Sequence, residues 1–78
     1  MYNEEILERL VNLFATMTEE EEINEDSELV EDLGISSMDI LMMMASLEEE
    51  FKISIPEKEI RKMYTVGDVV EVISARIK

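Results

Sequence analysis

Cysteine and histidine are absent from the 78-residue sequence. Without thiol or imidazole groups the chain cannot build a disulfide, a Cys or His metal centre, or a Ser-His or Cys-His catalytic pair. No apolar run approaches the ~18 residues that span a bilayer, and the N-terminus lacks the basic start and apolar stretch of a signal peptide. The sequence therefore predicts a cytoplasmic monomer with one domain over residues 1–78 and no membrane insertion.

Basic residues are also scarce, because 7 Lys and Arg stand against 20 Asp and Glu, a formal net charge of −13. This charge repels polyanions, so we expect no nucleic-acid partner. Sixteen of the acids lie in residues 1–50, where Arg9 is the single base, whereas residues 51–78 carry four acids and six bases. We expect the acidic half to face partners with basic docking patches, although such acidity also keeps a small protein soluble.

Apolar residues at helical spacing predict four helices, over residues 4–16, 37–51, 56–62 and 66–77. Each helix begins at residue types that start or cap helices: Asn3, Ser36 with Asp39, Pro56, and Thr65 with Asp68. The fold class is therefore all-α, a four-helix bundle with three longer helices and one short helix. No linker flanks the outer helices, so we expect a freestanding protein.

Between the first two helices, residues 18–35 form a long, mainly polar loop that Ile23, Leu29 and Val30 interrupt. Loops of this length in small domains are usually functional or poorly ordered. Acids in the loop leave open a calcium-binding or partner-binding module, but the glycine of an EF-hand is missing at the required position. We expect only weak divalent-ion binding there, and a small bundle leaves little space for the cleft of a hydrolase with paired carboxylates.

The helix predicted over residues 37–51 is apolar on more than one face. One stripe, formed by Ile40, Met43, Met44, Leu47 and Phe51, suits the core of the bundle. A second group occupies the next part of the helical wheel and must be partly exposed in so small a domain: Met38, Leu41, Met42 and Ala45. Isolated apolar residues are common on surfaces. With acids at its edge, however, this second group fits a docking face made of Met38, Asp39, Leu41, Met42, Glu48 and Glu49.

Four sequence blocks, taken together, resemble the acyl carrier protein family. The segment from Asp32 to Asp39 (DLGISSMD) is similar to the attachment motif of that family. It is followed, in the order and spacing of the family, by LEEEF at 47–51, ISIP at 53–56 and YTVGDVV at 64–70. The resemblance extends over residues 3 to 77 and implies a carrier that is not an enzyme.

The resemblance implies that Ser37 carries 4′-phosphopantetheine, which a separate phosphopantetheinyl transferase takes from coenzyme A. Acyl groups are then held as thioesters and presented to acyl-transferring and chain-elongating enzymes, most simply in fatty acid or related lipid biosynthesis. Independently of the family, a serine at a helix N-terminus is well placed to carry a phosphate. We expect an apolar acyl pocket lined by Ile40, Met44, Leu47, Phe51, Ile55, Ile60, Tyr64 and Val66.

Three positions depart from the family pattern. Ser36 stands where the family usually has Asp, Met38 where it usually has Leu, and Met42 where carriers of fatty acid synthesis commonly have Glu. These changes remain compatible with modification of Ser37. Because they remove two acids from the docking helix, they leave open a specialised carrier for polyketide or nonribosomal peptide synthesis.

Overall fold

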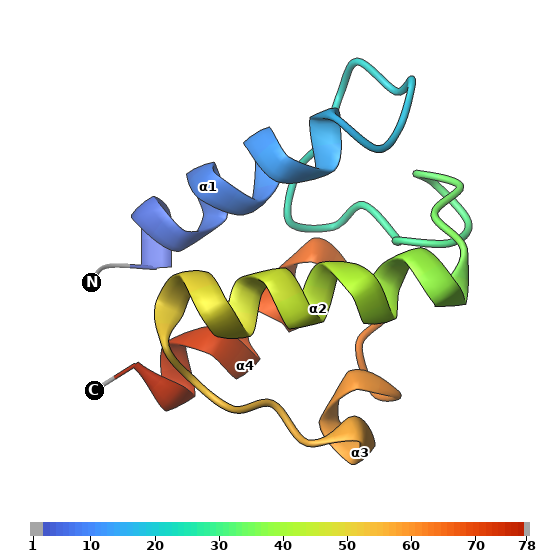
Figure 1. Ribbon diagram of the computed structural model, residues 1–78. Helices are drawn as coiled ribbons and strands as arrows, with labels where there is room; N and C mark the ends of the chain where they lie inside the picture. Colours follow the sequence, from blue (N-terminus) through green and yellow to red (C-terminus); the bar gives the residue numbers. More distant parts are fainter. Residues whose placement is uncertain (1–2, 78) are drawn as a thin grey trace.

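The computed structural model describes residues 3–77 and is all-α (Figure 1). Its helices are α1 (Asn3–Ala15), α2 (Ser37–Phe51), α3 (Glu57–Ile60) and α4 (Val66–Arg76). Helices α1 and α4 pack against each other, and the start of α1 and the end of α4 lie on the same side of the molecule (Figure 1). The predicted fold class is confirmed, whereas residues 1, 2 and 78 of the predicted domain lie outside the described residues.

Most predicted helix limits agree with the structure, and the differences have local causes. Helix α1 already includes Asn3, so this residue is not the predicted N-cap. Helix α3 is shorter than predicted, because Pro56 lies before it as N-cap. After it, the amides of Lys62 and Met63 donate to carbonyls three residues back. These tight turns end the helix and bring Met63 into the core.

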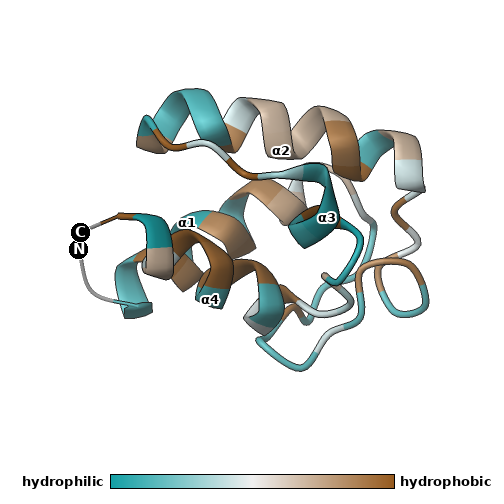
Figure 2. Cartoon of the chain, turned by 90° about the horizontal axis from the view of Figure 1, so that it is seen from below, coloured by the Kyte–Doolittle hydropathy of each residue, from teal (hydrophilic) through white to brown (hydrophobic). Residues whose placement is uncertain are grey.

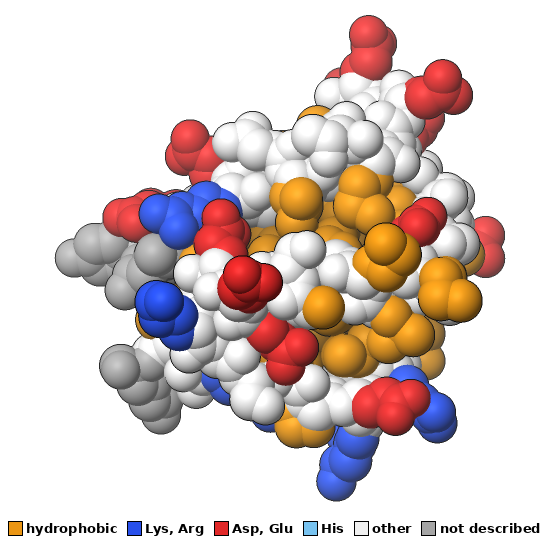
Figure 3. Space-filling model, viewed as in Figure 1, with side chains coloured by type: hydrophobic (Ala, Val, Ile, Leu, Met, Phe, Trp, Pro, Cys, Tyr) orange, Lys and Arg blue, Asp and Glu red, His pale blue; other side chains and the backbone are white. Residues whose placement is uncertain are grey.

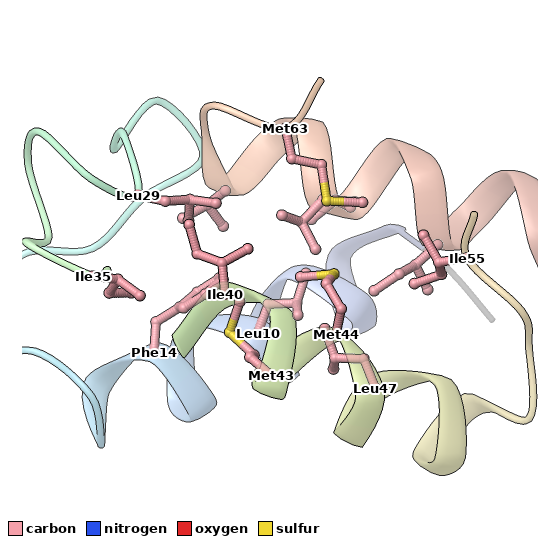
Figure 4. Close-up of a cluster of buried hydrophobic side chains, with 14 of the residues drawn as sticks. Leu10, Phe14, Leu29, Ile35, Ile40, Met43, Met44, Leu47, Ile55 and Met63 are labelled. Atoms are coloured by element: carbon pink, nitrogen blue, oxygen red, sulfur yellow. The ribbon is translucent and has the colours of Figure 1, made fainter. Parts of the chain in front are cut away.

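The hydrophobic core is formed largely by residues of α1, α2 and α4, and brown, hydrophobic segments of these helices are visible in Figure 2. Helix α1 buries Ile6, Leu10 and Phe14, which are four residues apart. Helix α2 buries four of the five residues of its predicted stripe, Ile40, Met43, Met44 and Leu47, while Phe51 is half-buried. Figure 4 shows the side chains of Met43 and Met44 reaching into this cluster. Each fully buried side chain of this size contributes roughly 1.5–3 kcal/mol through removal of apolar surface from water.

The long segment between α1 and α2 is anchored to the chain that precedes and begins α4. The amide of Leu29 donates to the carbonyl of Tyr64 at 2.8 Å, and the amide of Gly67 donates to the carbonyl of Glu25 at 2.8 Å. A Cβ atom at Gly67 would lie 3.0 Å from that Glu25 oxygen, so a larger residue would force the two segments apart. Leu29 is fully buried and anchors the loop in the core, whereas Val30 is 53% exposed and does not. This acidic segment is therefore a fixed part of the fold.

The last turn of the segment sets the direction in which the chain enters α2. Gly34 has a φ of +67°, a conformation in which other residues are strained. Its amide donates to the carbonyl of Val30 at 3.0 Å, and the amide of Ile35 donates to the carbonyl of Leu29 at 2.9 Å. Ile35 is buried by this turn, and the next residue, Ser36, is exposed as the N-cap of α2.

Candidate functional site

Two adjacent serines at the start of α2 have different surroundings. Ser36 is the N-cap: its backbone is extended, and its Oγ accepts a hydrogen bond from the amide of Asp39 at 3.2 Å. Ser37 is the first residue of the helix and is exposed. Within residues 3–77, no hydrogen bond involves the Ser37 hydroxyl. The predicted N-cap role of Ser36 is thus confirmed, and Ser37 presents an accessible hydroxyl.

The position of Ser37 suits attachment of an anionic group. The first amides of an α-helix lack acceptors within the helix, and the helix dipole adds partial positive charge at the same end. A phosphate joined to Ser37 would lie at this end of α2. The chain has no histidine that could remove the hydroxyl proton.

A cavity of about 400 Å³ adjoins Ser37 between α2 and the region of α3. Its wall is mainly apolar and consists of Val30, Ser37, Ile40, Leu41, Glu57, Ile60, Arg61, Met63 and Tyr64. The charged members of the wall, Glu57 and Arg61, pair with each other at 3.1 Å on the exposed side of α3. A cavity of this volume is within the range of small-molecule pockets.

The eight residues expected to line an acyl pocket are divided between the cavity and the core. Ile40, Ile60 and Tyr64 line the cavity next to Ser37. Four others are buried in the core cluster, namely Met44, Leu47, Ile55 and Val66. Phe51 is half-buried at the end of α2, where the guanidinium of Arg9 lies 5.7 Å from its ring centroid. Val30, Leu41 and Met63 line the cavity although the sequence did not single them out for it.

An apolar strip on α2, made of Met38, Leu41 and Met42, is exposed as predicted. The exposed fractions of these residues are 68%, 45% and 65%. Figure 3 shows hydrophobic side chains gathered over the part of α2 near its start and continuing towards α3, with acidic side chains around them. Asp39 and Glu49, which were expected at the edge of this strip, are also exposed.

Glu48 differs from the other acids of α2 because one of its oxygens is engaged within the fold. Its Oε2 accepts a hydrogen bond from the amide of Ile55 at 2.8 Å, and the residue is half-buried. Its main-chain carbonyl accepts the amides of Lys52 and Ile53. Lys52 is in the left-handed conformation with a φ of 56°. Glu48 therefore holds the linker between α2 and α3, a role that no local sequence pattern predicts because the donor, the amide of Ile55, lies seven residues away.

A capping box at the start of α4 fixes the other border of the cavity. The Oγ1 of Thr65 accepts the amide of Asp68 at 3.1 Å. The Oδ2 of Asp68 accepts the amides of Tyr64 at 2.9 Å and Thr65 at 3.1 Å. These hydrogen bonds, led by the one from Tyr64, hold the pKa of the Asp68 carboxyl below its ordinary value. The predicted pairing of Thr65 with Asp68 is confirmed.

The acidic loop uses several of its polar side chains for turns. The Oδ2 of Asp32 accepts the amide of Glu28 at 2.8 Å, and the Oδ1 of Asn24 accepts the amide of Asp26 at 2.8 Å. In the part of the chain that the structure describes, no three acidic side chains come close enough to hold a metal ion. Over the same residues, no helix is sufficiently long and apolar to cross a bilayer.

The arrangement of a free serine, a helix N-terminus and an adjoining apolar cavity agrees with comparisons to known proteins. Residues 8–73 match the family model of the phosphopantetheine attachment site. An acyl carrier protein of Borreliella burgdorferi is 41% identical over 78 residues, covering 97% of this chain and 98% of that protein. The chain belongs to the acyl carrier protein family.

Other acyl carrier proteins support the same assignment. One from Wolinella succinogenes is 51% identical over 53 residues, covering 68% of this chain and 70% of that protein. The structure of an acyl carrier protein from Thermotoga maritima, which is 22% identical, superposes with a TM-score of 0.80 and confirms the fold. That match covers 95% of this chain and 88% of the other.

Membership of the acyl carrier protein family fixes the general role of the chain. It has a phosphopantetheine attachment site and is a non-catalytic carrier. Its partners accordingly include a phosphopantetheinyl transferase and enzymes that handle acyl groups.

Proposed function

We propose that Ser37 is the attachment residue and that the loaded protein carries acyl groups in fatty acid or a related lipid biosynthesis. The observation that supports this choice most strongly is the difference between the two serines. The Ser36 hydroxyl is occupied as the N-cap of α2, whereas the Ser37 hydroxyl is exposed and lies beside the cavity. When attached, the prosthetic group supplies a phosphate at the helix N-terminus and a thiol that holds the acyl group as a thioester.

Intact-mass measurement after incubation with coenzyme A, magnesium and a phosphopantetheinyl transferase tests this proposal. Wild-type protein should gain one phosphopantetheine, and Ser37→Ala should gain none while keeping its helical circular-dichroism spectrum. Ser36→Asp is the matched control, because aspartate also caps helices well and the Ser37 hydroxyl stays in place. Loading of Ser37→Ala, or loss of loading in Ser36→Asp alone, would reject Ser37 as the attachment residue.

We also propose that the transferase docks on the α2 apolar strip and its acidic edge. An enzyme that reaches the Ser37 hydroxyl must cover the exposed surface next to it, which is formed by Met38, Leu41 and Met42. Asp39 and Glu49 supply negative charge for steering a partner with a basic patch. Glu48 belongs to the proposed edge too, but its hydrogen bond to Ile55 gives it a structural role that complicates its use as a test.

The cargo we propose for the cavity is an alkyl chain. The cavity adjoins Ser37, and its lining is dominated by aliphatic, methionine and tyrosine side chains. Such a lining favours an apolar chain over a polar polyketide or peptidyl intermediate, since polar groups would lose hydrogen bonds to water there. Met44 and Leu47, which are buried next to Ile40 along α2, are proposed as the residues that a longer chain reaches by repacking.

The nature of the cargo can be read from the protein purified from its own host. The thioester is cleaved with hydroxylamine, and the released acyl hydroxamates are identified by mass spectrometry. Unsubstituted alkyl chains would support lipid biosynthesis. Polyketide or aminoacyl products would instead place the protein in a specialised pathway.

A further inference from the structure

Five of the seven methionines divide sharply by exposure, while Met17 is half-buried and Met1 lies outside the described residues. Met38 and Met42 are 68% and 65% exposed, whereas Met43, Met44 and Met63 are 3%, 0% and 6% exposed. Figure 4 shows the sulfur atoms of the buried three among core side chains. An oxidant in solution should therefore react faster with the thioethers of Met38 and Met42 than with those of the core.

The two exposed methionines are placed where a change of polarity would matter most. They are four residues apart, so their side chains are neighbours on one face of α2. The adjacent row on the same helix is formed by Ser37 and Leu41, both of which line the cavity. The oxidisable pair thus flanks the attachment residue and belongs to the surface that a loading enzyme must cover.

We propose that Met38 and Met42 form an oxidation site through which peroxides reduce the loading of Ser37, an inference that rests on the proposed function of Ser37. In each reaction the sulfur lone pair attacks the protonated oxygen of the peroxide, an S–O bond forms, the O–O bond breaks, and the proton passes to the departing oxygen. The sulfur is oxidised by two electrons to the sulfoxide, and the peroxide is reduced to water or an alcohol. A thiol-dependent methionine sulfoxide reductase reverses the change.

The effect on docking follows from the polarity of the sulfoxide. A thioether can be buried under a partner without losing hydrogen bonds, whereas a sulfoxide oxygen loses its hydrogen bonds to water unless the partner replaces them. The expected decrease in the specificity constant for loading is about tenfold for oxidation of the pair. The fold is expected to persist, because the core methionines keep their thioethers.

The test treats unloaded protein with limiting hydrogen peroxide, maps the oxidised peptides by mass spectrometry, and then measures loading from coenzyme A by a phosphopantetheinyl transferase. We expect oxidation first at Met38 and Met42, an unchanged circular-dichroism melt, and about tenfold slower loading that the reductase restores. The double variant Met38→Leu, Met42→Leu is compared with its own untreated rate, and peroxide should leave that rate unchanged.

Each alternative result has a distinct meaning. Earlier oxidation of Met43 or Met44, equal loading of oxidised and untreated wild type, or peroxide sensitivity in the double leucine variant would overturn the oxidation site. Failure of untreated wild type to load at all would instead reject the proposed function of Ser37.

Discussion

Replacement of Asp68 by alanine should destabilise the protein by about 1–2 kcal/mol, because it removes one half of the α4 capping box. The carboxylate accepts hydrogen bonds from the amides of Tyr64 and Thr65. In the alanine variant both amides would have to donate to water instead. Tyr64 is exposed and Thr65 half-buried, which keeps the loss below that of two fully buried charged hydrogen bonds. For a domain of this size the change corresponds to a melting point lower by about 5–15 °C.

The dependence of stability on pH distinguishes the contribution of the Asp68 charge from that of the shape of its side chain. The folded pKa of Asp68 lies below its ordinary value of 3.8. Its contribution to stability is therefore complete above the unfolded pKa and is lost as the pH falls through the folded pKa. Asp68→Asn keeps an acceptor oxygen without the charge, so we expect about half the loss seen with alanine at pH 7.

Chemical denaturation of wild type and Asp68→Asn between pH 7 and pH 2.5 measures this difference. The stability gap between the two proteins should be constant from pH 7 to about pH 5 and should shrink below about pH 4. Asp39→Asn is a matched control, because Asp39 occupies the first turn of α2 without completing a capping box. A gap that stays constant down to the lowest pH, or that is no larger than the Asp39→Asn gap, would refute the assigned role of the carboxylate.

Further predictions concern docking, cargo and charge. Glu49→Lys should slow association with the transferase about two- to tenfold at low salt and flatten the salt dependence of the association rate, while dissociation changes less. Glu50→Lys, which alters the side of α2 that faces Arg9, is the control. Equal association rates for the two variants would refute steering by the acidic edge. Acyl-loaded protein should melt at higher temperature than the form with a free thiol, up to a limiting chain length; identical melting at every length would place the chain in solvent. Magnesium or monovalent salt should raise the melting point at neutral pH, because no ion pair among residues 3–77 involves the acidic run 19–22; indifference to both would show that this repulsion is already balanced.

The helices and their starts could be predicted from the sequence because their signals are local. The limits of α2, the capping by Ser36, and the capping box at Thr65 all follow from residue types three or four positions apart. The division of the α2 methionines also follows from helical periodicity, which places Met43 and Met44 inward and Met38 and Met42 outward.

The packing around the cavity could not be predicted in the same way. The amide of Leu29 donates a hydrogen bond to the carbonyl of Tyr64. Because every residue has these backbone groups, no sequence pattern predicts which of them will pair. The wall of the cavity depends on this contact, since Val30 and Tyr64 both line it. The use of Glu48 as an acceptor for Ile55 likewise depends on the path of the linker after α2, which periodicity does not determine.

Ser37 is proposed to carry a phosphopantetheine arm with an acyl cargo. Peptide mapping with fragmentation, on protein purified from its own host, tests this claim most directly, because it reports the modified residue and the thioester together. We predict that the peptide containing Gly34 to Asp39 carries the arm on Ser37, with an alkyl acyl group on part of the population. An arm on Ser36 or on another serine, or a population without any arm while the host's transferase is active, would contradict the account.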